Sequence, residues 1–498
     1  MKRGSGVLAP IFSLPSNYGI GDFGKNAYKF VDILYKRKQK VWQILPLVQT
    51  GYGDSPYSSV CSTSINPYFI SPEILLKKGL ITKNELKLAK MDCAKRVDYE
   101  FLYSTRFPLL RKAFSRFDRK NEDFLLFIEE KSAYDYALFM SLKNSNNFKN
   151  FWEWEEGLKY RDKKALEDLE EKYSEDILFW QFVQFEAFSE WQALKKYANQ
   201  KGIQILGDLP LYVALDSVDV WVNPKMFKLD ENFIPKKVAG VPPDYFCEKG
   251  QLWGNPVYDY EEHKKENFSW WVNRIKKALK QCDIIRIDHF RGLDRYFEID
   301  YGKIDATEGR WVDVPSRELF AEILKQIDKE RIIAEDLGVL DDGVKNLISW
   351  LDVPGMRILS FAFNGDKNNL YLPESVEENS ICYTGTHDND TLLGLIESFN
   401  NCDRNNFILG IKNSAKLLGV ELFGEDADSL INCVIGLGMA CKSKLFIIPI
   451  QDVLKKGSSY RINAPGSVSK NNWSIRFNKK EIAKLSKSLK KISKNFGR

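Results

Sequence analysis

Eight short apolar runs constrain the fold of this chain more than any other feature of its sequence. Each has the length of a strand and is rich in Ile, Leu, Val or Phe without clean alternation, which is typical of strands buried on both faces of a parallel sheet. The runs cover residues 7–14, 40–47, 203–209, 283–290, 331–338, 356–363, 381–388 and 444–452. Helical patterns separate several of them, at 175–201, 317–330 and 404–418. Repeated strand–helix–strand units predict an α/β fold with a parallel sheet, and eight strands predict a closed TIM (β/α)8 barrel.

The length of the chain predicts large insertions in this barrel. The chain has 498 residues, whereas a minimal barrel needs about 250. We expect residues 1–498 to form a single catalytic barrel domain with two inserted subdomains, because unstructured loops of such length are uncommon. Residues 48–202, after the second strand, are charged and helix-like, and predict a helical subdomain over the barrel mouth. Residues 210–282, after the third strand, are rich in aromatic residues and prolines and predict a more irregular subdomain. About 45 residues follow the eighth strand, too few for a C-terminal β-sandwich domain.

The positive charge of the chain is concentrated at its C-terminus. The formal net charge is +5, yet residues 479–498 hold seven lysines and one arginine against one acid, so the remainder sums to −2. This segment also carries an apolar stripe at helical spacing: Ile482, Leu485, Leu489, Ile492 and Phe496. The pattern favours an amphipathic helix docked on the body with a solvated lysine face, and the alternative is an anion-binding arm. We therefore expect no nucleic-acid partner.

Targeting signals and metal-site patterns are absent from the sequence. No apolar run approaches the roughly 18 residues of a membrane helix, and Gly6 and Pro10 interrupt the short N-terminal apolar stretch, which argues against a signal peptide. The eight cysteines include no C-x-x-C pair and lie among apolar neighbours, which favours buried thiols in a reducing cytoplasm. The three histidines do not have the spacing of a helical zinc motif. The sequence predicts a cytoplasmic protein without a membrane partner or a His-rich metal centre.

Three of the predicted strands end in an acidic residue. These residues are Asp288 in DIIRIDHFRG, Glu335 in RIIAEDLG and Asp388 in ICYTGTHDND. Catalytic groups of β/α barrels lie at the C-terminal ends of the strands. Carboxyl groups that converge there, with two of them about 5–5.5 Å apart, are the groups that cleave glycosidic bonds with retention of configuration.

The neighbours of these acids predict different roles for them. Arg286 lies two residues before Asp288 and therefore faces the same side of the strand, where its charge would keep Asp288 ionised and nucleophilic. The alternative is a structural Arg–Asp pair inside the barrel. Glu335 lies between apolar residues that would raise its pKa by desolvation, as a general acid requires. Its neighbour Asp336 would face the opposite side, and we expect a structural role for it.

Longer motifs resemble one family. The chain looks like the 4-α-glucanotransferases, which are the amylomaltases or disproportionating enzymes of the α-amylase superfamily, from about residue 1 to residue 476. The motifs that carry the resemblance are YGDSPYSSVCSTSINPYFI (52–70), GDLPLYVALDSVDVWVNPKMFKLDE (207–231), AGVPPDYFCEKGQLWGNPVYDY (239–260), RIDHFRGL (286–293), AEDLG (334–338), VPGMRILSFAF (353–363), TGTHDNDT (384–391) and RINAPG (461–466). Three positions depart from the usual pattern, at Pro315, Glu374 and Ile475. None of them touches the three carboxylates.

The resemblance implies a catalytic role for each strand-end acid. Asp288 would be the nucleophile and Glu335 the general acid and base. Asp388 would hold the ring hydroxyls of the substrate and stabilise oxocarbenium charge. All three groups are side chains, so we expect neither a metal nor an organic cofactor.

Further residues are candidates for binding sugar. His387 would donate a hydrogen bond to the sugar held by Asp388, and His289 is either a core histidine or a sugar contact, of which its place beside Asp288 favours the second. Most aromatic residues of a chain are core, but Tyr57 and Trp253 lie in Gly- and Pro-rich segments where sugar platforms are expected. The complete set of predicted binding residues is Tyr57, Asp244, Trp253, Arg286, His289, His387 and Asn463.

Family resemblance implies transfer of an α-1,4-glucan segment to the 4-hydroxyl of glucose or another α-1,4-glucan by a retaining double displacement. The expected partners are maltooligosaccharides and glucose, and the expected assembly is a monomer or weak homo-oligomer. Because the carboxylates alone do not separate transfer from hydrolysis, an α-amylase-like hydrolase remains an alternative. A second alternative is a catalytically silent glucan-binding protein.

Overall fold

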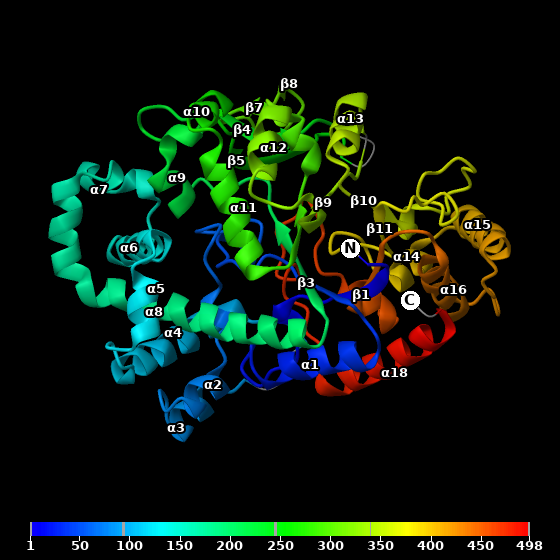
Figure 1. Cartoon of the computed structure of the whole chain (residues 1–498), viewed down its shortest axis with the longest axis horizontal. Helices are drawn as coiled ribbons and strands as arrows, with labels where there is room; N and C mark the ends of the chain where they lie inside the picture. The colour runs from blue at the N-terminus through cyan, green and yellow to red at the C-terminus, as the bar shows by residue number, and fades with distance from the viewer. Residues whose placement is uncertain (1, 92–94, 244–246, 339, 497–498) are drawn as a thin grey trace.

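The eight predicted strands form one parallel sheet that closes almost completely into a barrel (Figure 1). The structure, a computed structural model, describes residues 2–91, 95–243, 247–338 and 340–496. The strands of the barrel are β1 (Gly4–Leu8), β2 (Val41–Gln43), β3 (Gln204–Leu209), β6 (Ile284–Ile287), β9 (Ile332–Ala334), β10 (Gly355–Ile358), β11 (Ser380–Tyr383) and β12 (Leu445–Pro449). Their order is β10-β11-β12-β1-β2-β3-β6-β9, and all neighbouring pairs are parallel. The predicted TIM barrel is confirmed.

The first strand begins and ends earlier than predicted. β1 ends at Leu8, and Ile11–Ser13 form a short 3-10 helix. Pro10 has no N–H to donate to a neighbouring strand, which is why the apolar run 7–14 does not continue as a strand.

Helices surround the barrel where the sequence predicts them. The predicted helix 175–201 is the second half of α8 (Lys163–Gln200), and 404–418 lies in α15 (Asn401–Leu418). The prediction 317–330 corresponds to α12 (Ser316–Leu324), which is shorter because residues 329–331 form a separate 3-10 turn. The other helices outside the two insertions are α1 (Lys25–Lys36), α13 (Asp342–Leu351), α14 (Leu392–Ser398), α16 (Ala427–Ala440), α17 (Ile450–Val453) and α18 (Lys479–Phe496).

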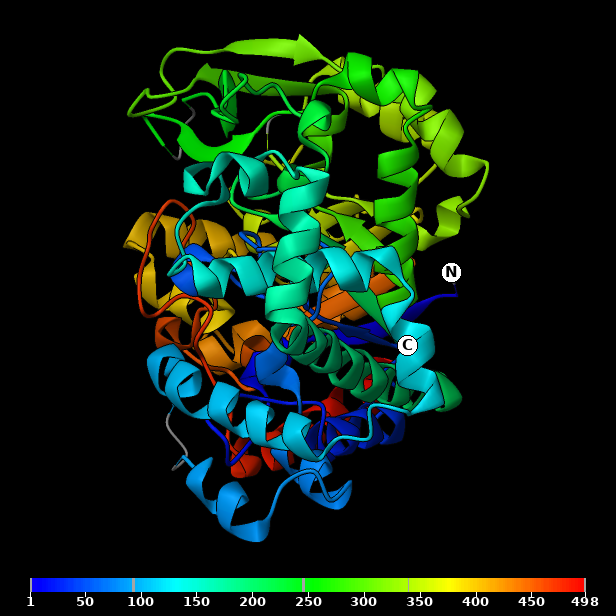
Figure 2. The same cartoon turned by 90° about the vertical axis from the view of Figure 1, so that its left-hand side faces the viewer.

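The segment between β2 and β3 is helical, as predicted. Figure 2 shows its helices in front of the barrel. They are α2 (Pro72–Lys77), α3 (Lys83–Leu88), α4 (Tyr99–Arg116), α5 (Glu122–Ile128), α6 (Lys131–Ser145), α7 (Glu156–Lys159) and α8.

The segment after β3 is more regular than predicted. It contains α9 (Val218–Val222), α10 (Tyr260–Lys265), α11 (Ser269–Gln281) and two strands, β4 (Lys237–Val241) and β5 (Gln251–Pro256). These strands join β7 (Arg295–Asp300) and β8 (Arg310–Asp313) in an antiparallel sheet of order β5-β4-β7-β8, which lies at the top of Figure 1. A small core of Val238, Phe297, Ile299 and Ala306 lies beneath it. Residues 237–241 and 251–256 of this segment are therefore strands, which were not predicted from the sequence.

The C-terminal helix α18 docks on the body, as its apolar stripe predicts. Ile482, Leu485 and Leu489 are buried, and Ile492 packs against the main core; the side chain of Phe496 lies outside the described residues. Figure 1 shows α18 running beside α1, where Arg37 Nε donates a hydrogen bond to Ser486 Oγ (3.0 Å). None of the helices in the described ranges is long and apolar enough to cross a membrane.

Cysteine burial follows the prediction at most described positions. Cys61, Cys282 and Cys433 are buried, but Cys402 is exposed on α15, contrary to the expectation of buried thiols. Cys93 lies outside the described residues.

Candidate active site

The three strand-end acids lie at one end of the barrel, because the strands that precede them are parallel. Asp288 follows β6, Glu335 follows β9, and Asp388 follows β11 by a short loop. β6 pairs with β3 on one side and with β9 on the other. In this register Arg286 of β6 lies opposite Asp208 of β3, which brings a fourth carboxylate to the site.

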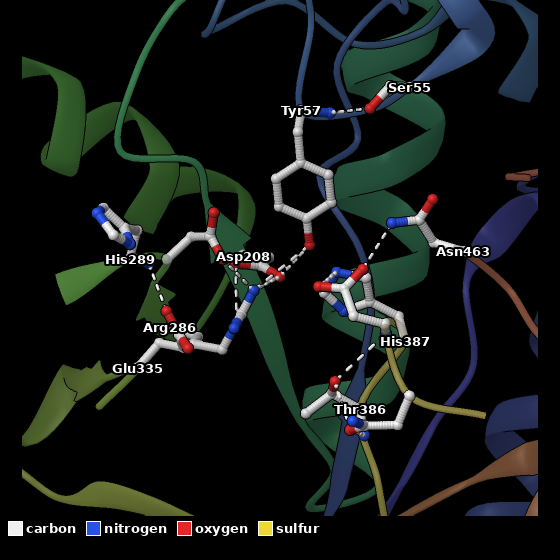
Figure 3. A network of polar contacts seen from close by, with 12 residues as sticks. Ser55, Tyr57, Asp208, Arg286, His289, Glu335, Thr386, His387 and Asn463 are labelled. Atoms are coloured by element: carbon white, nitrogen blue, oxygen red, sulfur yellow. Dashed lines mark hydrogen bonds and ion pairs between the residues drawn. The ribbon is translucent and has the colours of Figure 1, made fainter. Parts of the chain in front are cut away.

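Arg286 is the centre of the polar network (Figure 3). Its guanidinium is buried and donates to both carboxylate oxygens of Asp208, from Nε at 3.1 Å and from Nη2 at 2.9 Å. The same Nη2 donates to Asp288 Oδ1 at 2.7 Å. Tyr57 donates its hydroxyl hydrogen to Asp208 Oδ2 at 2.6 Å. Asp208 and Tyr57 therefore fix the arginine in the orientation that holds Asp288.

Two opposing effects set the protonation of Asp288. Burial raises the pKa of its carboxyl group above the ordinary value, and the nearby carboxylates Asp208, Glu335 and Asp388 raise it further. The charge of Arg286 opposes them by favouring the carboxylate. Because 28% of the Asp288 side chain is exposed, water offsets part of the cost of ionisation. Of these clustered acids, two accept hydrogen bonds from Arg286, namely Asp208 and Asp288.

Glu335 is in a different environment from Asp288. Its Oε2 accepts a hydrogen bond from the backbone N–H of His289 at 2.6 Å. Its own N–H donates to the Ile287 carbonyl (3.1 Å), and its carbonyl accepts from Phe290 N–H (3.2 Å). Burial raises the pKa of Glu335 to about 7, with Asp336 and Asp388 adding to the shift and Arg286 and the His289 N–H opposing it. Glu335 can therefore carry a proton near neutral pH and release it.

The backbone of His289 has an uncommon conformation that serves this contact. Its φ is +47°, in the left-handed region that non-glycine residues rarely adopt. Strained residues of this kind gather at functional sites. The turn directs the N–H of His289 toward the carboxylate of Glu335.

Asp388 is held by residues from the C-terminal part of the chain. Its Oδ1 accepts a hydrogen bond from Asn463 Nδ2 at 2.6 Å, and its backbone carbonyl accepts one from Arg461 Nη2 at 2.6 Å. His387 Nε2 lies 3.3 Å from Asp388 Oδ2. Burial lowers the pKa of His387, although Asp388 opposes the shift, so the imidazole is neutral and donates one hydrogen.

Aromatic rings line the space between these acids. Tyr57 stacks on His387 with ring centroids 5.2 Å apart and an interplanar angle of 13°, and Trp473 lies 5.5 Å from Tyr57. On the other side, Trp253 of β5 meets His289 edge to face at 4.8 Å. Trp253 is 37% exposed, and it forms an accessible apolar face of the kind on which a pyranose ring packs.

The structure brings together the predicted site residues that it describes. Arg286, Tyr57 and Asp288 share one hydrogen-bonded network. Figure 3 shows His289 and Glu335 on one side of Arg286 and His387 and Asn463 on the other. Trp253 contacts His289, and Asp388 accepts a hydrogen bond from Asn463. Asp244 lies outside the described residues.

Three further residues of the site were not predicted. Asp208 ends the third apolar run in the same way as the other acids end theirs, and the strand-end rule could have found it. Arg461 and Trp473 carry no such signal, since only the fold brings them to Asp388 and Tyr57.

Comparison with known proteins identifies the family. The family model described as 4-alpha-glucanotransferase matches residues 9–482. This chain belongs to the 4-α-glucanotransferase family. It is 44% identical over 472 residues to a 4-alpha-glucanotransferase of Clostridium butyricum, covering 94% of each chain, and 42% identical to one of Aquifex aeolicus, covering 100% of this chain and 99% of the relative.

The solved structures agree with this membership. An amylomaltase from Streptococcus agalactiae in complex with acarbose is similar over the whole of both chains, with a TM-score of 0.94 and 37% identity. The family model, these relatives and this amylomaltase all carry names of enzymes, so this member of the 4-α-glucanotransferase family is an enzyme. Its substrates are glucans, and its family works with retention of configuration.

Proposed function

We propose that this enzyme transfers segments of α-1,4-glucan between maltooligosaccharides, with Asp288 as nucleophile, Glu335 as acid and base, and Asp388 as the residue that binds the reacting sugar. The observation that carries the proposal is the contrast between two neighbouring acids. Asp288 accepts a hydrogen bond from a buried arginine at 2.7 Å, whereas burial raises the pKa of Glu335 to about 7. The direct ion pair with Arg286 favours the carboxylate form of Asp288 against the effect of burial, whereas Glu335 accepts its hydrogen bond from the neutral backbone N–H of His289, and this difference suits the two acids to different roles.

In the first step Asp288 attacks C1 of the donor sugar. The bond between C1 and the glycosidic oxygen breaks, and Glu335 gives its proton to that oxygen as the reducing-end fragment leaves. A β-linked glycosyl ester of Asp288 remains. Arg286 transfers no proton in this step; it holds the Asp288 carboxylate in place.

In the second step Glu335, now ionised, takes the proton of the acceptor 4-hydroxyl. The acceptor oxygen attacks C1, the ester bond to Asp288 breaks, and the product regains the α linkage. The Asp388 carboxylate, fixed by Asn463 and beside a neutral His387, suits the ring hydroxyls of the sugar at C1 and the positive charge that develops there.

Transfer requires that an acceptor sugar compete with water. Pre-oriented reactants reach effective molarities of about 10⁵ M or more, provided that water is kept from the ester. We infer that the two insertions supply this protection, because Tyr57 of residues 48–202 donates a hydrogen bond to Asp208 and Trp253 of residues 210–282 contacts His289, the neighbour of Asp288.

The product profile from maltotriose tests the proposed function. A transferase gives glucose and a ladder of longer dextrins with little gain in total reducing ends. An α-amylase-like hydrolase gives glucose and maltose with a steady gain in reducing ends. Binding of maltotriose without any change in it would contradict both readings and favour a silent glucan-binding protein.

A further inference from the structure

The barrel has a seam beside Glu335. β9 and β10 are the two ends of the parallel sheet. Within the described ranges they share a backbone hydrogen bond from Ala334 N–H to the Pro354 carbonyl (2.9 Å) but no ladder of paired residues. Strand edges without a ladder have unpaired backbone groups that need other partners. Glu335 is the first residue after β9, so the acid/base candidate stands at this seam.

Asp336 bridges the seam with its side chain. Its carboxylate is buried, and Oδ1 accepts a hydrogen bond from the backbone N–H of Met356 at 2.5 Å. Oδ2 accepts one from Arg357 Nη1 at 3.0 Å. The same Nη1 donates to the Met356 carbonyl at 2.7 Å, which fixes the guanidinium. One side chain after β9 thus makes two hydrogen bonds to β10.

Gly355 makes this bridge sterically possible. A Cβ atom on Gly355 would lie 2.3 Å from Asp336 Oδ2, whereas ordinary contacts of this kind are 3.4–4 Å. Gly355 is not among the glycines with positive φ. The glycine of the VPGMRIL motif is therefore explained by the close approach of the Asp336 carboxylate to β10.

We propose that Asp336 is a positioning residue for Glu335, because it ties the end of β9 to β10 and places a negative charge next to Glu335 in the chain. The inference rests on the proposed role of Glu335 as acid and base. On one side the backbone of Glu335 is tied to Ile287 and Phe290. On the other side the next residue, Asp336, binds β10 with its side chain. Because the chain is held on both sides of Glu335, the carboxyl group of Glu335 keeps its place during the reaction, as proton transfer requires.

Several charged and titratable groups, from different parts of the barrel mouth, act on Glu335. Arg286 of β6 and the His289 N–H favour its ionised form, while Asp336 and Asp388 favour the protonated form, with Asp336 the stronger of the two. Asp288 and the hydroxyl of Tyr371, which precedes β11, also lie within electrostatic range of Glu335. Removal of the Asp336 charge would lower the pKa of Glu335. Glu335 would then lose its proton, and with it the ability to act as an acid, at a lower pH.

The test measures kcat/KM for maltotriose as a function of pH in two variants. The pH at which kcat/KM falls on the alkaline side, the alkaline limb, should move in opposite directions in the two variants. Asp336→Asn keeps an oxygen for the Met356 N–H but removes the charge, and we expect the limb to move down by roughly one pH unit. Arg357→Gln removes the cation that partly neutralises Asp336, and we expect the limb to move up. Glu377→Gln is the matched control, because Glu377 also faces Arg357 (3.7 Å) but is 74% exposed; its limb should coincide with that of the wild type.

A limb that stays in place in both folded variants, whatever their melting temperatures, would overturn the inference and leave Asp336 a structural residue only. The proposed function fails by a different result, which is near-normal activity of Glu335→Gln or a wild-type profile without an alkaline limb.

Discussion

At the scale of single residues, Asp288 differs from Glu335 and Asp388 by the hydrogen bond that it accepts from Arg286. Without a carboxylate at this position no glycosyl ester can form, so Asp288→Asn should lower kcat by a factor of about 10⁴ or more. Asp283→Asn is the matched control, since Asp283 lies at the other end of the same strand and binds Asn199 and the Ile205 N–H. Its kcat should stay within a few-fold of wild type. Comparable losses in both variants would show that Asp288 supports the fold and does not react.

Protonation of Glu335 predicts a specific pH dependence. The pKa of this group is raised to about 7, and the first step needs its protonated form. For maltotriose, kcat/KM should therefore fall as the pH rises through about 7. A maltosyl donor with a fluoride leaving group needs no proton for departure, so its kcat/KM should lack this alkaline limb. If both donors give the same limb, the titrating group is not the acid that assists departure.

At the scale of elements, the segment after η9 (Ser458–Tyr460) holds the third carboxylate. Arg461 donates to the carbonyls of Asp388 and Asn463, both at 2.6 Å. Arg461→Met keeps the aliphatic stem but releases both carbonyls, and a misplaced Asp388 should lower kcat about 10- to 100-fold. Arg404→Met is the control, because Arg404 also donates to a backbone carbonyl, that of Glu425 (2.9 Å), on the outer surface. Equal kcat values for the two variants would mean that Asp388 is held well enough without Arg461.

Strand β5 presents Trp253 to the site, and this ring should affect the partition between sugar and water. Loss of a stacking ring weakens acceptor binding by about 1 kcal/mol, a roughly fivefold lower occupancy, whereas attack by water is unaffected. Trp253→Ala should raise the ratio of hydrolysis to transfer as total activity falls. The ratio follows from glucose and new reducing ends released from maltotriose over time. Trp350→Ala is the control, since Trp350 is 43% exposed on α13 and contacts Arg317 instead. An unchanged ratio in Trp253→Ala would make Trp253 a packing residue.

The elements also show which parts of the structure the sequence could predict. Barrel strands are buried on both faces, so continuous apolar runs reveal them, and the acids that end them follow from the same pattern. Strand β5 escaped because Gly254 has a φ of +76° and Pro256 ends the strand, and such residues usually indicate loops. Arg461 lies 73 residues from its partner Asp388, and no local pattern encodes a contact of that range.

At the scale of the whole molecule, one buried acid joins the loop that carries His387 and Asp388 to the end of the last barrel strand. Asp452 follows β12, and its carboxylate accepts hydrogen bonds from Thr384 Oγ1 (2.6 Å) and from the Leu392 N–H (2.8 Å). Thr384 and Leu392 lie on either side of the loop that carries His387 and Asp388. Asp452 therefore connects the last strand of the barrel with both ends of this loop.

Asp452 should make the stability of the enzyme depend on pH. Burial raises the pKa of its carboxyl group from 3.8 to about 6, so the folded state binds this proton more tightly than the unfolded chain. Its contribution to stability is complete below pH 4 and is lost as the pH rises through 6, a change on the order of 2–3 kcal/mol. Asp452→Asn cannot titrate, yet its oxygen still accepts from the Leu392 N–H and its amide donates to Thr384. The free energy of unfolding, measured in urea between pH 4 and pH 7, should decline less for this variant than for the wild type.

Asp300→Asn is the control. Asp300 is an exposed acid paired with Lys237, and the hydrogen bond with Lys237 lowers the pKa of Asp300, so this variant should show the same decline in stability as the wild type. If Asp452→Asn keeps the wild-type slope, Asp452 stays ionised in the folded protein and the loop of Asp388 is anchored by a buried charge.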